Sequence, residues 1–151
     1  MTERAHAGQL SHSLVARVRA VPGLSSLGDE LLLELVGDSA NLAWRAGRTV
    51  LERGSAPDAL YVVLSGAVRV LDGEGGELAR LGPGDHFGEF SLLLGQPRQH
   101  DVVAAEDCEL LVVPKECFDR TVAADPELGP RIREQAEQRM RENTRESLVP
   151  P

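Results

Sequence analysis

The sequence predicts one mainly β domain with flanking helices, and three observations lead to this fold class. The chain has 151 residues and is 42% hydrophobic, enough for one compact core that buries about two thirds of the unfolded surface. Short apolar runs separated by turn signals fill residues 43–113. The residues on either side show helical spacing or a helix-like composition. We therefore expect an N-terminal helical segment over 1–42, a β region over 43–114, and helices with a tail over 115–151.

The first forty residues predict two helices. Leu10, Leu14, Val18 and Val21 recur at helical spacing. After the stretch PGLSSLGDE, the apolar run LLLELV predicts a second helix. Asp29 stands just before this run, where a side-chain oxygen can cap a helix N-terminus.

The middle of the chain consists of runs typical of strands. These runs are YVVLSGAVRVL, ELARLGPG and VVAAEDCELLVV, and the turn signals between or before them are ERGSAPDA, DGEGG and GPGD. Their spacing is typical of an all-β barrel or sandwich.

Beyond Pro114 the pattern returns to helix, with KECFDRTVAAD, an interruption at Pro126 and Pro130, and then the charged stretch RIREQAEQRMRENTRES. A narrow apolar stripe at four-residue spacing follows this last helix, formed by Leu128, Ile132, Ala136 and Met140. Such a stripe usually packs on its own domain. The alternatives are a dimer seam or a lid, although the stripe is short for a coiled coil.

The charge and the hydropathy exclude several classes of partner. The formal net charge of −8 repels nucleic-acid phosphates and anionic lipid. No stretch reaches the ~18 to 20 apolar residues of a membrane span, and MTERAHAGQL lacks the apolar region of a signal peptide. We therefore expect a cytoplasmic protein with no nucleic-acid partner and no direct membrane contact, in which an anionic ligand needs a local positive site.

Residues 87–105, FGEFSLLLGQPRQHDVVAA, contain such a site. Gly88 permits close approach of the backbone to a ligand, and a short helical turn from Glu89 to Leu94 would offer free N–H groups to an anion. Arg98 follows nine residues after Glu89, and a guanidinium can bind two oxygens of one phosphate. Glu89 repels phosphate but can accept a hydrogen bond from a hydroxyl, such as one on a ribose. The alternative is a surface salt bridge between Glu89 and Arg98.

The order of the surrounding residues resembles the cyclic nucleotide-binding domain family, of the catabolite-activator and protein kinase A regulatory-subunit type. The resemblance covers about residues 21–128. It rests on LGPGDHFGE, PR and VVA, preceded by Gly47, Val50, Gly54, Asp58, Tyr61, Val63, Gly66, Val68 and Val70. It implies an eight-stranded β-roll, a jelly-roll-like double-stranded β-helix, with N-terminal helices and C-terminal B- and C-type helices.

The resemblance also implies a phosphate-binding cassette at residues 87–99. By position, Gly88 and the turn N–H groups would meet the cyclic phosphate, Glu89 the ribose 2′-hydroxyl, and Arg98 the exocyclic phosphate oxygens. The expected ligand-binding residues are Phe87, Gly88, Glu89, Phe90, Ser91, Arg98, Gln99 and His100. In the family the helices after the roll usually close over the base, and the candidates here are 115–124 and 130–147.

The sequence departs from the family directly after Arg98, where small residues are usual and Gln99, His100 and Asp101 stand instead. If the following Val102 and Ala104 point into the roll, strand alternation sends His100 inward and Asp101 outward. An inward imidazole would fill part of the pocket or contact the phosphate.

The sequence offers little support for a metal site or a catalytic site. Cys108 and Cys117 lack metal-site spacing and are expected to be small buried hydrophobes. The four histidines lie apart, at His6, His12, His86 and His100. No HxH pair of a cupin-like metalloenzyme exists, His86 reads as a turn residue, and no nucleophile arrangement is visible. We therefore expect a domain that is not an enzyme and holds no metal.

The predicted function is a cyclic nucleotide sensor whose C-terminal helices rearrange. We expect cyclic AMP rather than cyclic GMP, because bacterial-looking domains of this sort most often use it, while Gln99 favours neither base. The output would pass to a homodimer partner or a downstream effector through the C-terminal helix. Because no winged helix follows Pro151, we expect no DNA-binding function in this chain. The alternative function is a degenerate domain that binds no nucleotide, serves as a protein-interaction or structural module, and closes its pocket with an Arg98 to Glu89 bridge.

Overall fold

The computed structural model describes residues 14–148. Residues 14–19 are helical. The elements that follow are α3 (Asp29–Gly37), β1 (Ala40–Trp44), β2 (Thr49–Leu51), β3 (Ala59–Ser65), β4 (Val68–Leu71), β5 (Glu77–Leu81), β6 (His86–Phe87), α4 (Glu89–Leu94), β7 (Asp101–Ala104), β8 (Cys108–Pro114), α5 (Lys115–Ala124) and α6 (Leu128–Leu148).

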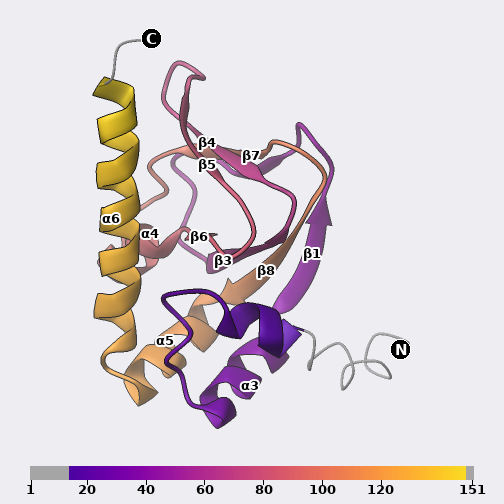
Figure 1. Cartoon of the computed structure of the whole chain (residues 1–151), viewed down its shortest axis with the longest axis vertical. Helices are drawn as coiled ribbons and strands as arrows, with labels where there is room; N and C mark the ends of the chain where they lie inside the picture. The colour runs from indigo at the N-terminus through magenta and orange to yellow at the C-terminus, as the bar shows by residue number, and fades with distance from the viewer. Residues whose placement is uncertain (1–13, 149–151) are drawn as a thin grey trace.

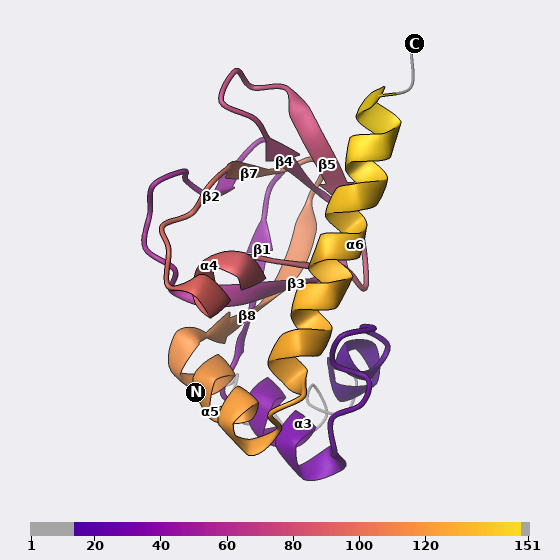
Figure 2. The same ribbon diagram turned by 90° about the vertical axis from the view of Figure 1, so that its left-hand side faces the viewer.

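The strands form two four-stranded antiparallel sheets, in the orders β1-β8-β3-β6 and β2-β7-β4-β5. Figure 1 shows the roll above α3 and α5, with α6 along one side and α4 between α6 and the roll. Figure 2 shows α6 crossing the roll beside α4. The predicted fold class, a mainly β roll of eight strands with flanking helices, is confirmed.

Strand β3 separates two hydrophobic cores, which explains why its sequence is an almost continuous apolar run. Ala59, Tyr61 and Val63 face the interior of the roll, whereas Leu60, Val62 and Leu64 face the core under the helices. Because successive side chains of a strand point to opposite faces, a strand covered on both faces needs apolar residues at every position. The sheet that contains β3 therefore forms a wall between the roll interior and the helices.

The core under the helices, which we call the second core, holds them against this wall. Leu32, Leu35 and Val36 of α3 and Cys117 and Phe118 of α5 are buried in it. The apolar stripe of α6 packs on its own domain, since three of its members, Leu128, Ile132 and Ala136, are buried. The side chain of Met140 lies outside the described part. Pro130 is accommodated in the first turn of α6, where backbone N–H groups lack intrahelical partners.

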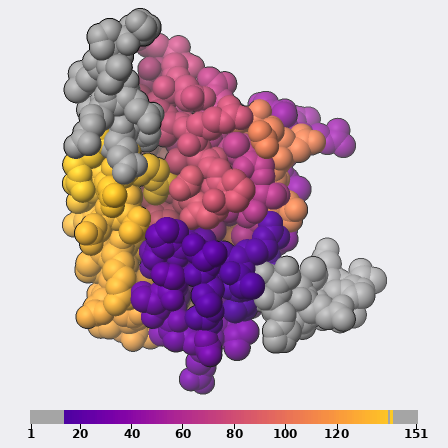
Figure 3. Space-filling model, in the orientation of Figure 1, coloured from indigo at the N-terminus to yellow at the C-terminus, as the bar shows by residue number. Residues whose placement is uncertain are grey.

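The N-terminal prediction needs one correction. Asp29 is not the helix cap, because the cap position of α3 is Gly28, without a side-chain hydrogen bond. Asp29 instead lies in the first turn, where the helix dipole favours a carboxylate, and it pairs with Arg19. Figure 3 shows the segment that precedes α3, in indigo, lying against α6. Their contact includes a hydrogen bond of 2.5 Å from Arg131 Nη1 to Ser26 Oγ.

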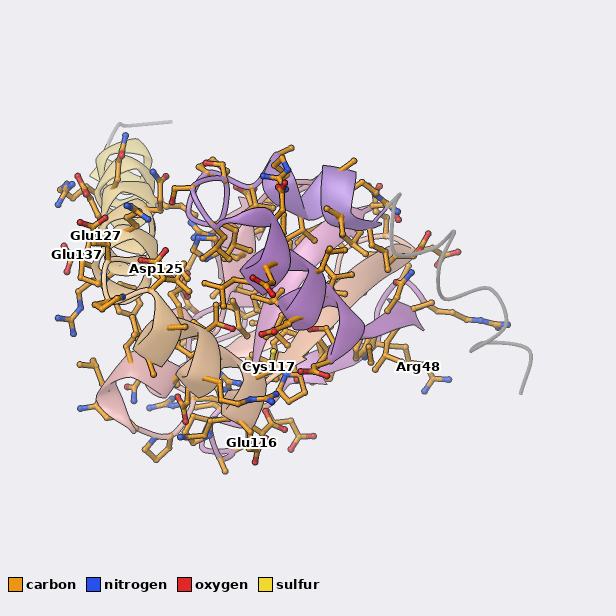
Figure 4. The ribbon with its side chains drawn as sticks, turned by 90° about the horizontal axis from the view of Figure 1, so that it is seen from below. Arg48, Glu116, Cys117, Asp125, Glu127 and Glu137 are labelled. Atoms are coloured by element: carbon orange, nitrogen blue, oxygen red, sulfur yellow. The ribbon has the colours of Figure 1, made fainter. Side chains whose placement is uncertain are left out.

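Both cysteines are buried free thiols, as expected for small hydrophobic residues. Burial raises the pKa of Cys108 and of Cys117, so both remain neutral thiols near pH 7. Figure 4 shows Cys117 between α5 and α3, where its Sγ lies 3.9 Å from the carbonyl oxygen of Leu35. Over residues 14–148 the structure contains no helix long and apolar enough to cross a membrane, and no group of side chains arranged to hold a metal ion.

Candidate functional site

Gly88 sets the geometry of the predicted cassette. It joins β6 to α4 with a φ of +91°, in the left-handed region that glycine alone adopts readily. A Cβ at this position would lie 2.7 Å from Arg98 Nη1 and 3.2 Å from the carbonyl oxygen of Ala59. Glycine therefore allows the backbone to turn and the Arg98 side chain to pass directly over it. The predicted helical turn from Glu89 to Leu94 is α4.

Arg98 is a buried cation with incomplete partners. Its side chain is 2% exposed. Nη1 donates to the carbonyl of Gly88 at 2.8 Å, and Nη2 donates to the carbonyl of Ala59 at 2.6 Å and to Asp58 Oδ1 at 3.3 Å. Nε is buried and has no hydrogen-bond partner among residues 14–148.

The charge of Arg98 is only partly balanced. Among the described residues its one carboxylate partner is Asp58, whose side chain is 72% exposed, so water weakens the pair. A buried cation with an unsatisfied N–H is costly unless a further acceptor is available. The geometry therefore favours an anion with several oxygens beside Arg98.

An aromatic stack supports the guanidinium from the roll interior. The rings of Tyr61 and Phe87 stack with centroids 5.1 Å apart, and Arg98 Cζ lies 5.9 Å from the Tyr61 centroid. Trp44 meets Tyr61 edge-on at 6.5 Å. Burial, followed by the Asp58 carboxylate, raises the pKa of Tyr61, so the phenol stays neutral at physiological pH. Phe87 thus lies in the roll core and stacks on Tyr61, the ring that contacts Arg98, the predicted phosphate contact.

Glu89 lies in a separate buried cluster. The exposed fractions of Glu89 and His86 are 5% and 3%. Glu89 Oε1 lies 2.7 Å from His86 Nδ1 and accepts from Arg139 Nη2 of α6 at 3.2 Å. Arg139 Nη1 donates to the carbonyl of His86. The interpretation of His86 as a turn residue is wrong, because His86 is a buried residue of β6 that binds the cassette glutamate.

Sequence reasoning did not find Arg139. The available signal was its position seven residues after the buried Ile132, which places both on the same face of α6. The Arg98 to Glu89 bridge, expected for an empty pocket, is absent from the ion pairs of the described residues. Arg98 pairs instead with Asp58, and Glu89 pairs with His86 and Arg139.

Two other predicted residues lie within α4. Ser91 is buried, and its carbonyl accepts from the backbone N–H groups of Gly95 and Gln96, which close the end of the helix. Phe90 is half-buried.

Gln99 and His100 are exposed, and the inward orientation expected for His100 is wrong. Strand β7 begins only at Asp101, so strand alternation does not extend back to His100. Asp101 Oδ1 accepts from the backbone N–H of Arg53 at 2.7 Å, and Gln99 Nε2 donates to the carbonyl of Pro97 at 3.0 Å. Val102 is buried, as expected.

Comparisons with known proteins point to one family of domains. The family described as cyclic nucleotide-binding domain matches residues 42–125. A cAMP-dependent protein kinase regulatory subunit of Yarrowia lipolytica is 36% identical over 104 residues, which cover 68% of this chain and 28% of that protein. A cyclic nucleotide-gated potassium channel of Rhizobium etli is 31% identical over 122 residues, 81% of this chain and 34% of the channel.

The Cyclic AMP receptor protein of Thermus thermophilus is 43% identical over 76 residues, 48% of this chain and 35% of that protein. This chain therefore spans about a third of the length of these curated relatives. Among solved structures, the regulatory domain of Toxoplasma gondii PKA with cAMP has a TM-score of 0.80 at 18% identity, over 89% of this chain and 52% of that one, which shows the shared fold. The chain belongs to the cyclic nucleotide-binding domain family.

Proposed function

We propose that this domain binds a cyclic nucleotide at residues 87–99 and acts as a sensor rather than as an enzyme. The buried guanidinium of Arg98 supports this function most strongly, because its Nε–H lacks a partner among the described residues. A cyclic phosphate is a monoanion with two exocyclic oxygens, so it would supply both an acceptor and the missing counter-charge. Charge-assisted hydrogen bonds of this kind are about twice as strong as neutral ones.

The two halves of the site suit the two halves of the ligand. Arg98 and the backbone at Gly88 would bind the phosphate, and Glu89 would accept from the ribose 2′-hydroxyl. Phe87, Phe90, Ser91, Gln99 and His100 stay predicted members of the site, with Phe87 supporting Arg98 through Tyr61.

Cyclic AMP is the proposed nucleotide. Two relatives are named for cyclic AMP, the Yarrowia kinase regulatory subunit and the Thermus receptor protein. Another, a cGMP-dependent phosphodiesterase of Dictyostelium discoideum, is 39% identical over 85 residues. Both nucleotides therefore belong in the test.

The proposed output is a movement of α5 and α6, because these helices pack beside the cassette and on the wall formed by β3 and β8. We also predict that the signal passes through α6 to a second copy or to an effector. The cytoplasmic location remains a prediction. So does the absence of enzymatic, metal, nucleic-acid and membrane functions.

Isothermal titration of the purified protein with cyclic AMP and cyclic GMP tests this function. Arg98→Gln removes the guanidinium. Arg80→Gln is the matched control, because Arg80 is half-exposed and forms a surface ion pair with Glu106. We expect cyclic AMP to bind the unaltered protein and the control alike. Each charge-assisted hydrogen bond lost in Arg98→Gln should weaken binding roughly 10- to 150-fold.

Equal affinities for the Arg98→Gln and Arg80→Gln variants would contradict the proposed site. No binding of either nucleotide by a sample folded by circular dichroism would favour the alternative, a domain that keeps the fold as a protein-interaction or structural module.

A further inference from the structure

In the described part of the chain the two sheets end in edge strands, and most of these edges are protected against pairing with another chain. The edges are β1, β6, β2 and β5. β6 and β2 have only two and three residues, and β5 carries the charged side chains of Glu77 and Arg80. Short length and charge are common defences of an edge against strand addition. β1 has neither, because it is five residues long and its sequence, ANLAW, contains no charged residue and no proline.

The free side of β1 is accessible as far as the described residues are concerned. β1 pairs with β8 along one side, and no other strand of residues 14–148 pairs with it. Residues 40–43 are exposed, and Leu42, at the centre of the strand, is 46% exposed. Figure 1 shows β1 on the side of the roll opposite α6. Unpaired backbone N–H and C=O groups beside an exposed leucine form a template for an incoming strand.

The two ends of β1 carry opposite charges. Arg45 and Arg48 follow the strand, are exposed, and form no ion pair or side-chain hydrogen bond within residues 14–148. They line an open hollow at this end, and Figure 4 shows the Arg48 side chain pointing away from the domain. Asp38 precedes the strand at the C-cap of α3, whose last turn contains no basic residue. Its ion pair with Arg120 lies at the surface, with side chains that are 50% and 69% exposed.

We propose that β1 pairs in antiparallel orientation with β1 of a second copy of this chain. A two-fold axis at Leu42 places the two Leu42 side chains next to each other on one face of the sheet. The same register places Arg45 of each copy opposite Ser39 of the other copy, beside Asp38. Antiparallel pairing thus brings each basic end to an acidic end. Parallel pairing would bring like charges together, which destabilises a sheet.

The same surface of both copies forms this interface, as in other two-fold dimers. The sheet β1-β8-β3-β6 would continue from one copy into the other. The interface includes neither Arg98 nor Glu89, so the inference does not depend on nucleotide binding. Because a five-residue strand edge gives a small interface, we expect a weak dimer.

Sedimentation velocity of the full chain between about 1 and 500 µM measures this dimer. Leu42→Lys places two like charges next to each other at the two-fold axis. Leu78→Lys is the matched control, because Leu78 is 39% exposed on another edge strand, β5. The unaltered protein and Leu78→Lys should dimerise alike, whereas Leu42→Lys should dimerise at least about tenfold more weakly. Circular dichroism confirms that each variant is folded.

Charge reversal tests the direction of the strands. Arg45→Glu alone and Asp38→Arg alone each place like charges at both ends of the interface, so each variant should dimerise about tenfold more weakly. An equal mixture of the two variants should form a heterodimer with about the affinity of the unaltered protein, because both contacts then join opposite charges again. A loss caused only by damage to the fold would not be restored by mixing.

An unaltered protein that stays monomeric up to about 500 µM would overturn the proposal. Equal dimerisation of Leu42→Lys and Leu78→Lys would overturn it too, as would a mixture that associates no more strongly than the separate charge variants. Slow hydrogen exchange on the free side of residues 40–44 in a monomer would show that another segment of the chain covers this edge, which also contradicts the proposal.

Discussion

Replacing Gly88 with alanine tests the cassette geometry without any ligand. The left-handed backbone at Gly88 costs an alanine about 1–2 kcal/mol. The new Cβ would also lie 2.7 Å from Arg98 Nη1. Arg98 cannot move away freely, because its two terminal nitrogens are bound to buried carbonyls. Displacing it forfeits a hydrogen bond of a charged group, about 1.5–3 kcal/mol.

Gly84 provides the matched control. It has the same φ of +91°, but a Cβ built there meets nothing within 4 Å. Gly84→Ala should therefore lose only the backbone contribution of about 1–2 kcal/mol, whereas Gly88→Ala should lose about 2.5–5 kcal/mol in total. The difference between the two variants isolates the contact with Arg98.

Urea unfolding followed by the fluorescence of Trp44, the single tryptophan, gives both free energies of unfolding. Equal losses at Gly84 and Gly88 would refute the packing of Arg98 over Gly88. So would a Gly88→Ala loss below about 2 kcal/mol, since that is the backbone contribution alone.

Three further predictions follow from burial and charge. Ile132→Ala should lower the free energy of unfolding by about 2–5 kcal/mol in a urea titration, because this side chain of α6 is fully buried in the core under the helices. A loss below about 1 kcal/mol would contradict this packing. Cys108 and Cys117 should resist a thiol reagent at pH 7.5 and react fully in urea, because burial raises the pKa of each thiol and lowers its thiolate fraction. Rapid reaction of the native protein would contradict the burial of these thiols. Backbone N–H groups that hydrogen-bond the carboxylate lower the pKa of Asp72, so its stabilising contribution is present above about pH 4 and is lost as pH falls through the lowered pKa. An NMR titration of Asp72 with a midpoint above about 4 would contradict this.

The fold and the geometry around the proposed phosphate contacts, Gly88 and Arg98, were predictable because their signals are local. The apolar runs and turn signals of residues 43–113 set the strands, and Gly88 and Arg98 lie within one short motif. The turn after Gly88 was likewise visible as a short apolar run bounded by glycines, and it became α4.

The surroundings of Glu89, the proposed ribose contact, depend on a contact between distant segments of the chain. Arg139 lies 50 residues after Glu89, and its position on the Ile132 face of α6 indicates that it faces the domain but not which residue it contacts. The role of His86 follows from the same contact. His100 was placed wrongly because strand alternation applies only within a strand, and the strand begins one residue later. Asp29 was placed wrongly by one position, which changes a cap into a first-turn residue.

The proposed function requires the buried Nε–H of Arg98 to donate to the phosphate of a cyclic nucleotide. The most direct measurement is the Nε–H NMR signal of Arg98, assigned from the spectrum of Arg98→Lys and followed while cyclic AMP is added. A new charge-assisted hydrogen bond should shift this signal downfield in proportion to occupancy and slow its exchange with water. An Arg98 Nε–H signal that stays unchanged at saturating cyclic AMP would contradict the claim.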